Sequence, residues 1–547
     1  MGAGNHASAD VADPNSLYSY GGLEKHSRMM LAHIVLMILA WFFILPIGVI
    51  FSIARSRHVL PVQLVFLALN GVGVIMGTVY NVGTPDLYEN NAHHSIGWIA
   101  TWVVTAQVVM SLLFLYTGRT KPGGAKARET ARFLPMSTEN MASFTESPVS
   151  PYHDYRWSSE GGHHADRSFS GTTQNSRDMS PNDDTNRLSK EEPARSDYNE
   201  DEDDDHADLS MALPGRKRRS LLGINRIDSF LLKRVQGLFS ARLLKATEII
   251  YELIDRTILV LGFIALTTGV VTYTGIFKGH GIFGGLAHFI KGGIFFWYGL
   301  LTLGRWMGCF ADFGWAWNLK PSRSEVGQWK ARIPSAEFTE SFVIFFYGST
   351  NVFLEHLGGW GGAWSAQDFE HVSIAIMFFG GGLCGMLVES KTIRKWLNTA
   401  PVQYNYSFNP LPGLIILMLG VLMSAHQQSS MVSTTVHAQW GGLLAGFALA
   451  RGVTYIILYI SPPTSIYPSR PPSELVSSFC LISGGLVFMA SASDIVQWME
   501  ANNIMAMVTL TVTVGFTTFL MAYTIIVLSL KGWVVRRELK LARPGLF

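Results

Sequence analysis

The sequence is poor in cysteine and in charged residues. Its 547 residues include only three cysteines, Cys309, Cys384 and Cys480. No two of them form a C-x-x-C pair, so neither a zinc ribbon nor a disulfide framework is predicted. Charged residues make up 15% of the chain, against about 25% in average proteins. The sequence has no H-E-x-x-H, nucleophile-elbow or P-loop motif, so hydrolase and ATPase functions are not indicated.

Long hydrophobic runs are abundant instead. Hydrophobic residues make up 48% of the chain, and they gather into about eleven runs long enough to cross a bilayer. The runs lie at about 29–54, 59–81, 94–118, 249–276, 281–308, 338–355, 371–389, 410–428, 433–460, 474–499 and 503–531. Continuous runs predict helices, because the strands of a membrane barrel alternate polar and apolar residues. We therefore predict an all-α polytopic transmembrane protein whose partner is the lipid bilayer, with no nucleic acid involved.

Lysine and arginine are concentrated in alternate loops, which marks the cytosolic side. They occur in the turn ARSRH, in the loops 309–337 and 390–409, and in the tail KGWVVRRELKLAR. The other loops nearly lack them, with Lys278 as the exception. Eleven spans then put the N-terminus outside or in a lumen and the C-terminus in the cytosol, in the plasma membrane or an endomembrane.

The composition divides the chain into two membrane regions. Residues 1–28 form a tail, 29–118 a three-helix region, and 246–536 a helical domain whose first span could complete the first bundle; a short tail, 537–547, follows. Between them, 119–245 contains the runs EDEDDD and GRKRR. Its composition predicts a disordered cytosolic linker, through which cytosolic partners could bind. The linker ends in a basic segment that would either lie on the membrane surface or extend the next helix.

Histidines lie at the ends of the first three spans. His33 opens the first span, His58 the second, and His93 and His94 the third. Under the predicted orientation, His33 shares the outer depth with His93 and His94. Two imidazoles from facing helices can hold a haem iron, although histidine also suits a membrane boundary without any ligand.

The segment AHIVLMILAWFFILPIGVIFSIAR resembles the first haem-ligand helix of the cytochrome b561 family. HVLPVQLVFLALNGVGVIMG and AHHSIGWIATWVVTAQVV resemble the next two helices, and His93 fits the family pattern better than His94. In that family four helices hold two haems, each between two histidines. The resemblance implies one b-type haem between His33 and His93. The inner partner of His58 is missing, because Asp255 and Arg256 stand where a histidine is expected.

The second membrane region carries histidines and glutamates near the predicted outer face. The candidate ligands of a transition metal are His280, His288, Glu355, His356, Glu370, His371, His426 and His437. Imidazoles and carboxylates bind zinc, copper or iron. They also relay protons, and packing at the interface needs neither role. Arg451, inside an apolar run, would snorkel to the surface or pair with a carboxylate such as Asp494.

The strings GHGIFGGLAHFIKGG, ESFVIFFYGSTNVFLEHLGG, EHVSIAIMFFGGGLCGMLVES and VHAQWGGLLAGFALARG resemble the C-terminal region of fungal Ytp-type integral membrane proteins. A b561-like part, a long linker and a many-helix part follow one another in those chains, as they do here. The resemblance implies no defined reaction, and whether the protein is an enzyme stays open. The leading hypothesis is haem or metal binding in membrane redox chemistry; the alternatives are an ion or proton transporter and a non-enzymatic interaction protein.

Overall fold

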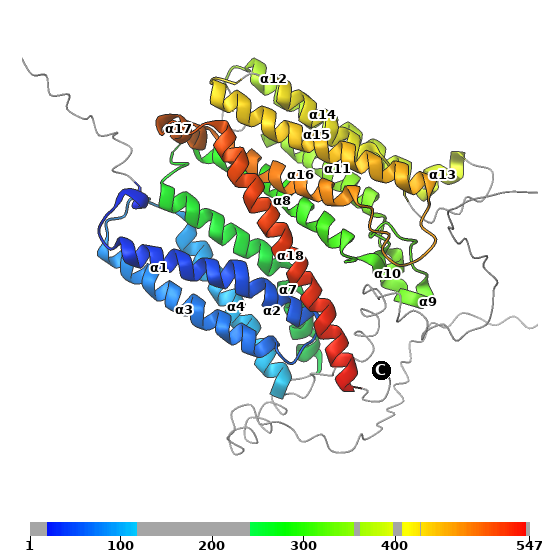
Figure 1. Cartoon of the computed structure of the whole chain (residues 1–547), viewed down its shortest axis with the longest axis horizontal. Helices are drawn as coiled ribbons and strands as arrows, with labels where there is room; N and C mark the ends of the chain where they lie inside the picture. The colour runs from blue at the N-terminus through cyan, green and yellow to red at the C-terminus, as the bar shows by residue number, and fades with distance from the viewer. Residues whose placement is uncertain are drawn as a thin grey trace, which may run out of the picture. The chain divides into compact units, whose positions relative to one another are not determined.

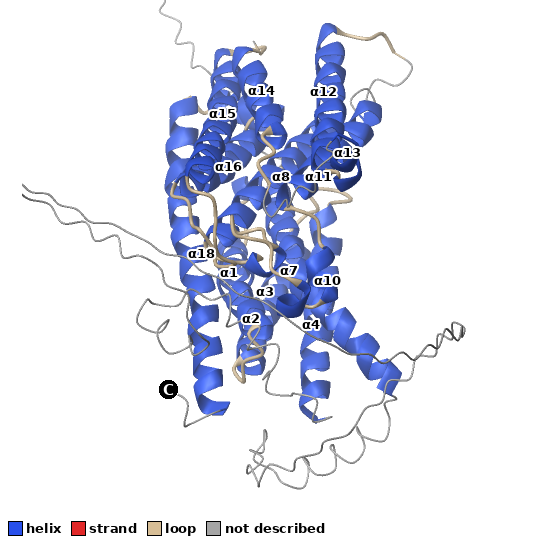
Figure 2. Ribbon diagram, turned by 90° about the vertical axis from the view of Figure 1, so that its right-hand side faces the viewer, coloured by secondary structure: helices blue, strands red, loops and turns tan. Residues whose placement is uncertain are grey.

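The computed structural model describes residues 19–116, 241–279, 281–354, 362–397, 407–426 and 428–542. Every regular element in these ranges is a helix (Figure 2), which confirms the predicted all-α class. The long helices alternate with short ones, whose bounds are η2 Tyr20–Gly22, η5 Ala311–Phe313, α9 Arg323–Val326, α10 Gln328–Arg332, α13 Lys391–Leu397 and α17 Ser493–Ala501.

The N-terminal bundle consists of four rods, the first of which is built from three consecutive elements. Its helices are α1 Ser27–Met37, the π-helix η3 Ile38–Ile44, α2 Leu45–Ile53, α3 Val59–Gly83, α4 Ala92–Tyr116 and α7 Ala241–Thr274 (Figure 1). Trp41, Phe66, Val104 and Ile258 come from all four rods and are buried in one apolar cluster. Helix α7, which follows the linker, therefore packs with the three helices that precede it.

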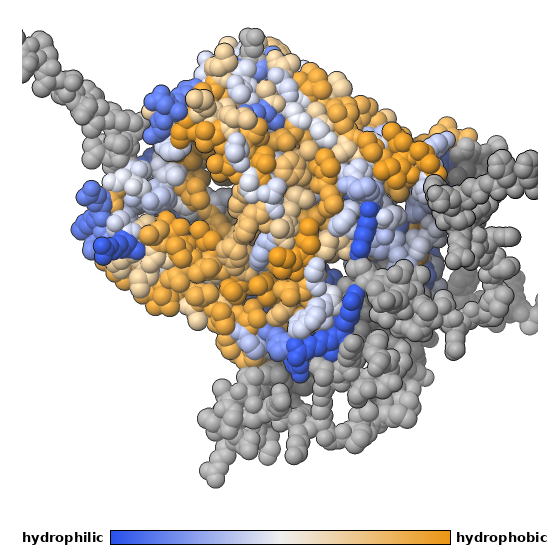
Figure 3. All heavy atoms as spheres, viewed as in Figure 1, coloured by the Kyte–Doolittle hydropathy of each residue, from blue (hydrophilic) through white to orange (hydrophobic). Residues whose placement is uncertain are grey.

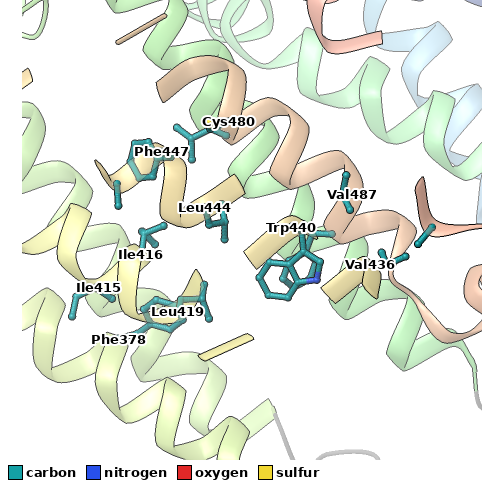
Figure 4. Close-up of a cluster of buried hydrophobic side chains, with 14 of the residues drawn as sticks. Phe378, Ile415, Ile416, Leu419, Val436, Trp440, Leu444, Phe447, Cys480 and Val487 are labelled. Atoms are coloured by element: carbon teal, nitrogen blue, oxygen red, sulfur yellow. The ribbon is translucent and has the colours of Figure 1, made fainter. Parts of the chain in front are cut away.

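The C-terminal bundle contains the remaining long helices. They are α8 Gly281–Trp306, α11 Ala336–Leu354, α12 Ala366–Glu389, α14 Leu411–Ala425, α15 Met431–Ile460, α16 Ser473–Ala490 and α18 Ala506–Ala542. Its main core gathers Phe378, Leu419, Trp440 and Leu444 from helices α12, α14 and α15 (Figure 4). The Trp440 ring packs 4.3 Å from the ring of Phe488 on α16, measured between centroids.

Each of the eleven predicted spans coincides with a described helix, and eight of these helices are long and apolar enough to cross a membrane. Helix α14 is shorter, and α7 and α11 lie outside the set of eight, so eleven spans remains a prediction. The predicted span 474–499 was too long: α16 ends at Ala490, and α17 begins at Ser493 as a separate helix. Large apolar side chains such as Trp102 and Ile75 are exposed on the bundle surface, and Figure 3 shows a broad hydrophobic area over α1 and α3, as a lipid-facing surface requires.

Pro46 shapes the first rod and its contact with the last helix. A proline has no N–H and clashes with the preceding turn of an α-helix, and the seven residues before Leu45 form a π-helix. The carbonyl oxygen of Phe43 accepts a hydrogen bond from the Tyr523 hydroxyl of α18 at 2.7 Å. The Phe42 ring stacks on the Tyr523 ring at 5.5 Å. The two bundles therefore contact each other through α18.

Glycines set the separation of α8 and α16. A Cβ atom at Gly292 would lie 2.6 Å from the carbonyl oxygen of Gly485, and one at Gly485 would lie 2.5 Å from that of Gly292. Small residues let membrane helices approach this closely. The approach places the Ser478 hydroxyl 2.9 Å from the carbonyl oxygen of Gly299, to which it donates.

We expect Gly485→Ala to destabilise the bundle by about 1–3 kcal/mol, because the added methyl group overlaps the α8 backbone. Gly442→Ala on α15 is the matched control, since nothing lies within 4 Å of its Cβ position and alanine favours a helix over glycine. Thermal unfolding in detergent measures both. A Gly485→Ala protein as stable as the control would contradict the close approach.

Candidate functional site

His33 and His93 lie together at one end of the N-terminal bundle. Their ring centroids are 6.3 Å apart, and the ring planes are inclined by 78°. Two imidazoles that bind one metal ion from opposite sides, with metal–nitrogen bonds of about 2.0 Å, have centroids about 6 Å apart. The observed pair has that separation.

The two rings use the same nitrogen for hydrogen bonding. Nδ1 of His33 lies 2.8 Å from the carbonyl oxygen of Gly73 on α3, so it donates. Nδ1 of His93 lies 3.4 Å from the Thr268 hydroxyl oxygen on α7. Because the Thr268 hydroxyl donates its proton to the carbonyl oxygen of Ile264, it accepts from Nδ1 of His93. In this arrangement each Nδ1 carries the proton, and each Nε2 has a lone pair for a ligand.

Glycines leave room for both imidazoles. A Cβ atom at Gly77 would lie 2.8 Å from Nδ1 of His33, and one at Gly269 would lie 3.0 Å from Cε1 of His93. A larger residue at either position would displace the ring. His94 is exposed, and its backbone N–H bonds to Asn91. The structure therefore brings together His33 and His93, and not His94.

The other end of this bundle holds a hydrogen-bond network in place of a second histidine pair. One Asp255 oxygen accepts from the Ser52 hydroxyl and the other from the Gln107 amide, both at 2.5 Å. The Tyr251 hydroxyl bonds to Ser52 and accepts from Ser111. His58 caps α3, and its nearest aromatic neighbour is Phe51, with centroids 6.3 Å apart. Among the described residues, no histidine faces His58.

The histidines of the C-terminal bundle gather at one end of it. Nδ1 of His426 lies 2.9 Å from a carboxylate oxygen of Glu370. A positive charge on His437 or His371 would repel one on His288 of α8, and a positive charge on His426 would repel one on His437. Nδ1 of His288 and of His437 bonds to a carbonyl oxygen one turn back, on Gly284 and Ser433 respectively.

No three of these side chains, and no other three histidines, cysteines or carboxylates in the described ranges, stand close enough to hold a metal ion. His280, Glu355 and His356 lie outside the described residues. The described residues therefore do not form the predicted metal site by themselves. The described members form a polar group with one carboxylate–imidazole pair.

A buried ionic network occupies the opposite end of the same bundle. Arg451 is 1% exposed and Glu474 is fully buried; Nε of Arg451 donates to Glu474 at 2.6 Å. Nη1 of Arg451 lies 3.5 Å from Glu340, which accepts from Arg305 at 2.7 Å. Glu337 lies 3.8 Å from Arg305. Four helices, α8, α11, α15 and α16, contribute to this network.

Arg451 pairs with a carboxylate, as one of the two predicted alternatives has it, but the partner is Glu474 and not Asp494. The other alternative, that Arg451 snorkels to the surface, was wrong. Burial by α8, α11 and α16 keeps the guanidinium inside the bundle, where only paired charges are tolerated. Asp494 instead accepts from the backbone N–H of Phe277 at 2.7 Å. The sequence signal for the network was the presence of Arg305, Arg451 and Glu474 at or inside apolar runs, but the sequence does not reveal which charges meet.

The network has unused hydrogen-bonding atoms. Nη2 of Arg451, Oε2 of Glu474, the Ser477 hydroxyl and the Thr302 hydroxyl are buried, and none bonds to another described residue. The ring of Trp317, from the loop after α8, lies 4.4 Å from the Arg305 guanidinium carbon. Free buried donors and acceptors can bind water or a small polar ligand.

Sequence comparisons place the chain among fungal proteins. It is 33% identical to the uncharacterized membrane protein C3B8.06 of Schizosaccharomyces pombe, over 98% of this chain and 100% of the relative. The family model of the YTP1-like C-terminal region matches residues 261–532, and that of the domain of unknown function DUF2427 matches 19–117. This chain belongs to the fungal YTP1-like family of membrane proteins.

Two further members of the YTP1-like family come from Saccharomyces cerevisiae. The uncharacterized membrane protein YCR061W is 41% identical over 55% of this chain and 50% of its own length. Protein YTP1 is 28% identical over 29% of this chain and 31% of its own length. No solved structure matches the chain. The family assignment establishes an integral membrane protein and leaves its activity to be inferred from the site.

We expect Arg451→Met to lower the free energy of unfolding by about 3–5 kcal/mol, because it leaves the Glu474 carboxylate buried and unpaired. The double variant Arg451→Met/Glu474→Gln removes both charges and is expected to recover at least about 1 kcal/mol. Lys395→Met, at an exposed position on α13, is the control and should be neutral. Thermal unfolding in detergent of the wild type, Arg451→Met, Glu474→Gln, the double variant and the control tests this; strictly additive losses from the two single variants would exclude a direct Arg451–Glu474 interaction.

Proposed function

We propose that this membrane protein binds one b-type haem between His33 and His93 and acts in membrane redox chemistry. The observation that carries the proposal is the orientation of the two rings: 6.3 Å between centroids, with both Nδ1 atoms bound to oxygen atoms of α3 and α7. Histidines that ligate a metal through one ring nitrogen usually donate a hydrogen bond from the other.

The surrounding residues support an axial ligand pair. Gly73 holds the His33 ring through its carbonyl, and Thr268 holds the His93 ring through its hydroxyl. Gly77 and Gly269 make the cradle in which the rings lie, since a Cβ atom at either would meet an imidazole. A bound haem would supply one-electron transfer at this depth.

The residues at the other end of the bundle support a proposal of one haem and not of two. Asp255, Ser52, Gln107 and Tyr251 hydrogen-bond to one another there, and His58 faces no second imidazole among the described residues. Both Asp255 oxygens already accept hydrogen bonds, from Ser52 and Gln107. Electrons would therefore enter and leave through the His33–His93 end, which faces outward in the predicted orientation.

The second candidate function is transport of protons or small ions through the C-terminal bundle. It is favoured by two polar groups at opposite ends of the same helices. His288 and Arg305 lie about 25 Å apart along α8, and His437 and Arg451 about 20 Å apart along α15. Trp440, Leu444 and Phe447 fill the core between them. Ionisable groups in a membrane bundle commonly mark such paths.

For haem, we expect the purified wild-type protein to give a b-type α-band in its reduced-minus-oxidised spectrum. His33→Ala and His93→Ala should each abolish the band, because one imidazole is lost. His94→Ala is the control and should retain the band, since that side chain is exposed. A colourless wild-type protein would refute haem binding, and metal analysis of the same sample would show whether another metal is bound.

For transport, we expect liposomes containing the wild-type protein to dissipate an imposed pH gradient faster than empty liposomes. His437→Ala should slow this flux, because it removes a titratable group from the core-facing side of α15. His58→Ala, in the other bundle, should leave the flux unchanged. Equal leakage from wild-type and empty liposomes would exclude proton transport.

A further inference from the structure

A long groove lies between the two bundles. It has a volume of about 2340 Å³ and is lined by α2 and α7 on one side and by α8 and α18 on the other. Along α7 it runs from Leu244 to Val270, a distance of about 39 Å at the helical rise per residue. Sites for drug-sized molecules measure about 300–1000 Å³, so this groove suits a larger ligand.

Most of the groove wall is apolar. Phe263, Phe296, Leu300 and Leu520 line its middle, and the Phe263 and Phe296 rings stack with centroids 5.1 Å apart. From Arg256 to Val270 the lining extends about 21 Å along α7. One leaflet of a bilayer has about 15 Å of hydrocarbon. An acyl chain that begins beside Arg256 therefore fits within the apolar part.

Charged residues also line the groove, and Arg256 lies about midway along its α7 wall. Six lysine and arginine side chains line the groove, against four carboxylates. The carboxylates all have partners in the protein. Glu248 and Glu252 pair with Arg55, Asp312 pairs with Lys330 at 2.8 Å, and Asp255 accepts from Ser52 and Gln107.

Two of the basic residues have no such partner. Arg256 on α7 and Lys531 on α18 make no ion pair or hydrogen bond with the residues that the structure describes. Both lie near Cys309, which lines the groove after α8. Burial raises the pKa of the Cys309 thiol, and the positive charges of Lys531 and Arg256 act in the opposite direction. Cys309 therefore marks a place that the positive charges of Arg256 on α7 and Lys531 on α18 both reach, although the adjacent Asp255 carboxyl also lies within range of Arg256.

We propose that this groove binds an anionic glycerophospholipid, with its phosphate between Arg256 and Lys531 and its acyl chains along Phe263, Phe296 and Leu520. Charge complementarity selects this occupant, because basic pockets between membrane helices bind anionic headgroups. The apolar wall requires acyl chains, which free phosphate lacks. The site is separate from the His33–His93 pair and does not depend on haem binding.

Binding is measured on the full-length protein by native mass spectrometry in detergent, with phosphatidylglycerol as the anionic probe and phosphatidylcholine as the zwitterionic one. We expect phosphatidylglycerol to bind more tightly. The variant Arg256→Gln/Lys531→Gln should lower its affinity about 30-fold, because each basic residue near an anionic headgroup contributes about 1 kcal/mol. Phosphatidylcholine binding should change little.

The matched control is Arg323→Gln/Lys395→Gln, which removes the same charge from exposed positions outside the groove lining. It should bind phosphatidylglycerol as the wild type does. The charge-retaining variant Arg256→Lys/Lys531→Arg should also bind, and thermal unfolding without added lipid verifies that every variant is folded. Glycerol phosphate, which has no acyl chains, should not compete.

Three results would overturn the proposal. They are equal affinity of the wild type for the two lipids, equal loss in the groove variant and the control, and competition by glycerol phosphate. A wild-type protein that retains no lipid would also overturn it. The haem spectrum is independent of all these outcomes, so failure here and failure of the haem proposal are distinguishable.

Discussion

Charged side chains inside a membrane bundle must be paired, and in this protein that requirement acts on four helices at once. Arg451 bonds to Glu474 and approaches Glu340, and Arg305 bonds to the same Glu340. These side chains lie on four different helices. Each buried charge nevertheless needs its partners nearby, because an unpaired charge inside the bundle is strongly destabilising. The network therefore sets the rotation of α8, α11, α15 and α16 about their axes. This rotation also decides which helix faces point into the bundle. Those faces form the glycine contact between α8 and α16 and the apolar core around Trp440.

The polar side chains inside the N-terminal bundle are also hydrogen-bonded, but the groups involved differ between its two ends. At one end two imidazoles are held by oxygen atoms of neighbouring helices, with one nitrogen of each ring left over. At the other end Asp255, Ser52, Gln107 and Tyr251 satisfy one another. The first end brings two imidazoles together, whereas the second is a network of hydroxyl, amide and carboxyl groups. The two ends therefore differ in the chemistry that they offer to a ligand.

The helices could be predicted from the sequence, but the contacts between side chains on different helices could not. Long apolar runs predicted the helices, since backbone groups in lipid must bond internally. The depth of His33 and His93 followed from span boundaries, and the structure brings the two rings together. The pairing of Arg451 with Glu474 did not follow, because periodicity assigns a face to each residue but no partner across helices. The break at Ala490 was missed because apolar residues such as Ile495, Val496 and Met499 follow it, although α17 also contains Asp494 and Glu500.

The hydrogen bond from Tyr523 to the carbonyl of Phe43 joins residues at opposite ends of the sequence. Membrane proteins are inserted as they are synthesised, beginning with the N-terminal helices. The π-helical segment before Pro46 is therefore inserted before Tyr523 has been synthesised. Its Phe43 carbonyl receives the hydrogen bond from the Tyr523 hydroxyl only after α18 has left the ribosome. The first helix to enter the membrane is thus among the last to reach its final hydrogen bonding. A truncated chain that ends before α18 would present the rings of Phe42 and Phe43 to the lipid in place of the α18 aromatic residues that they contact.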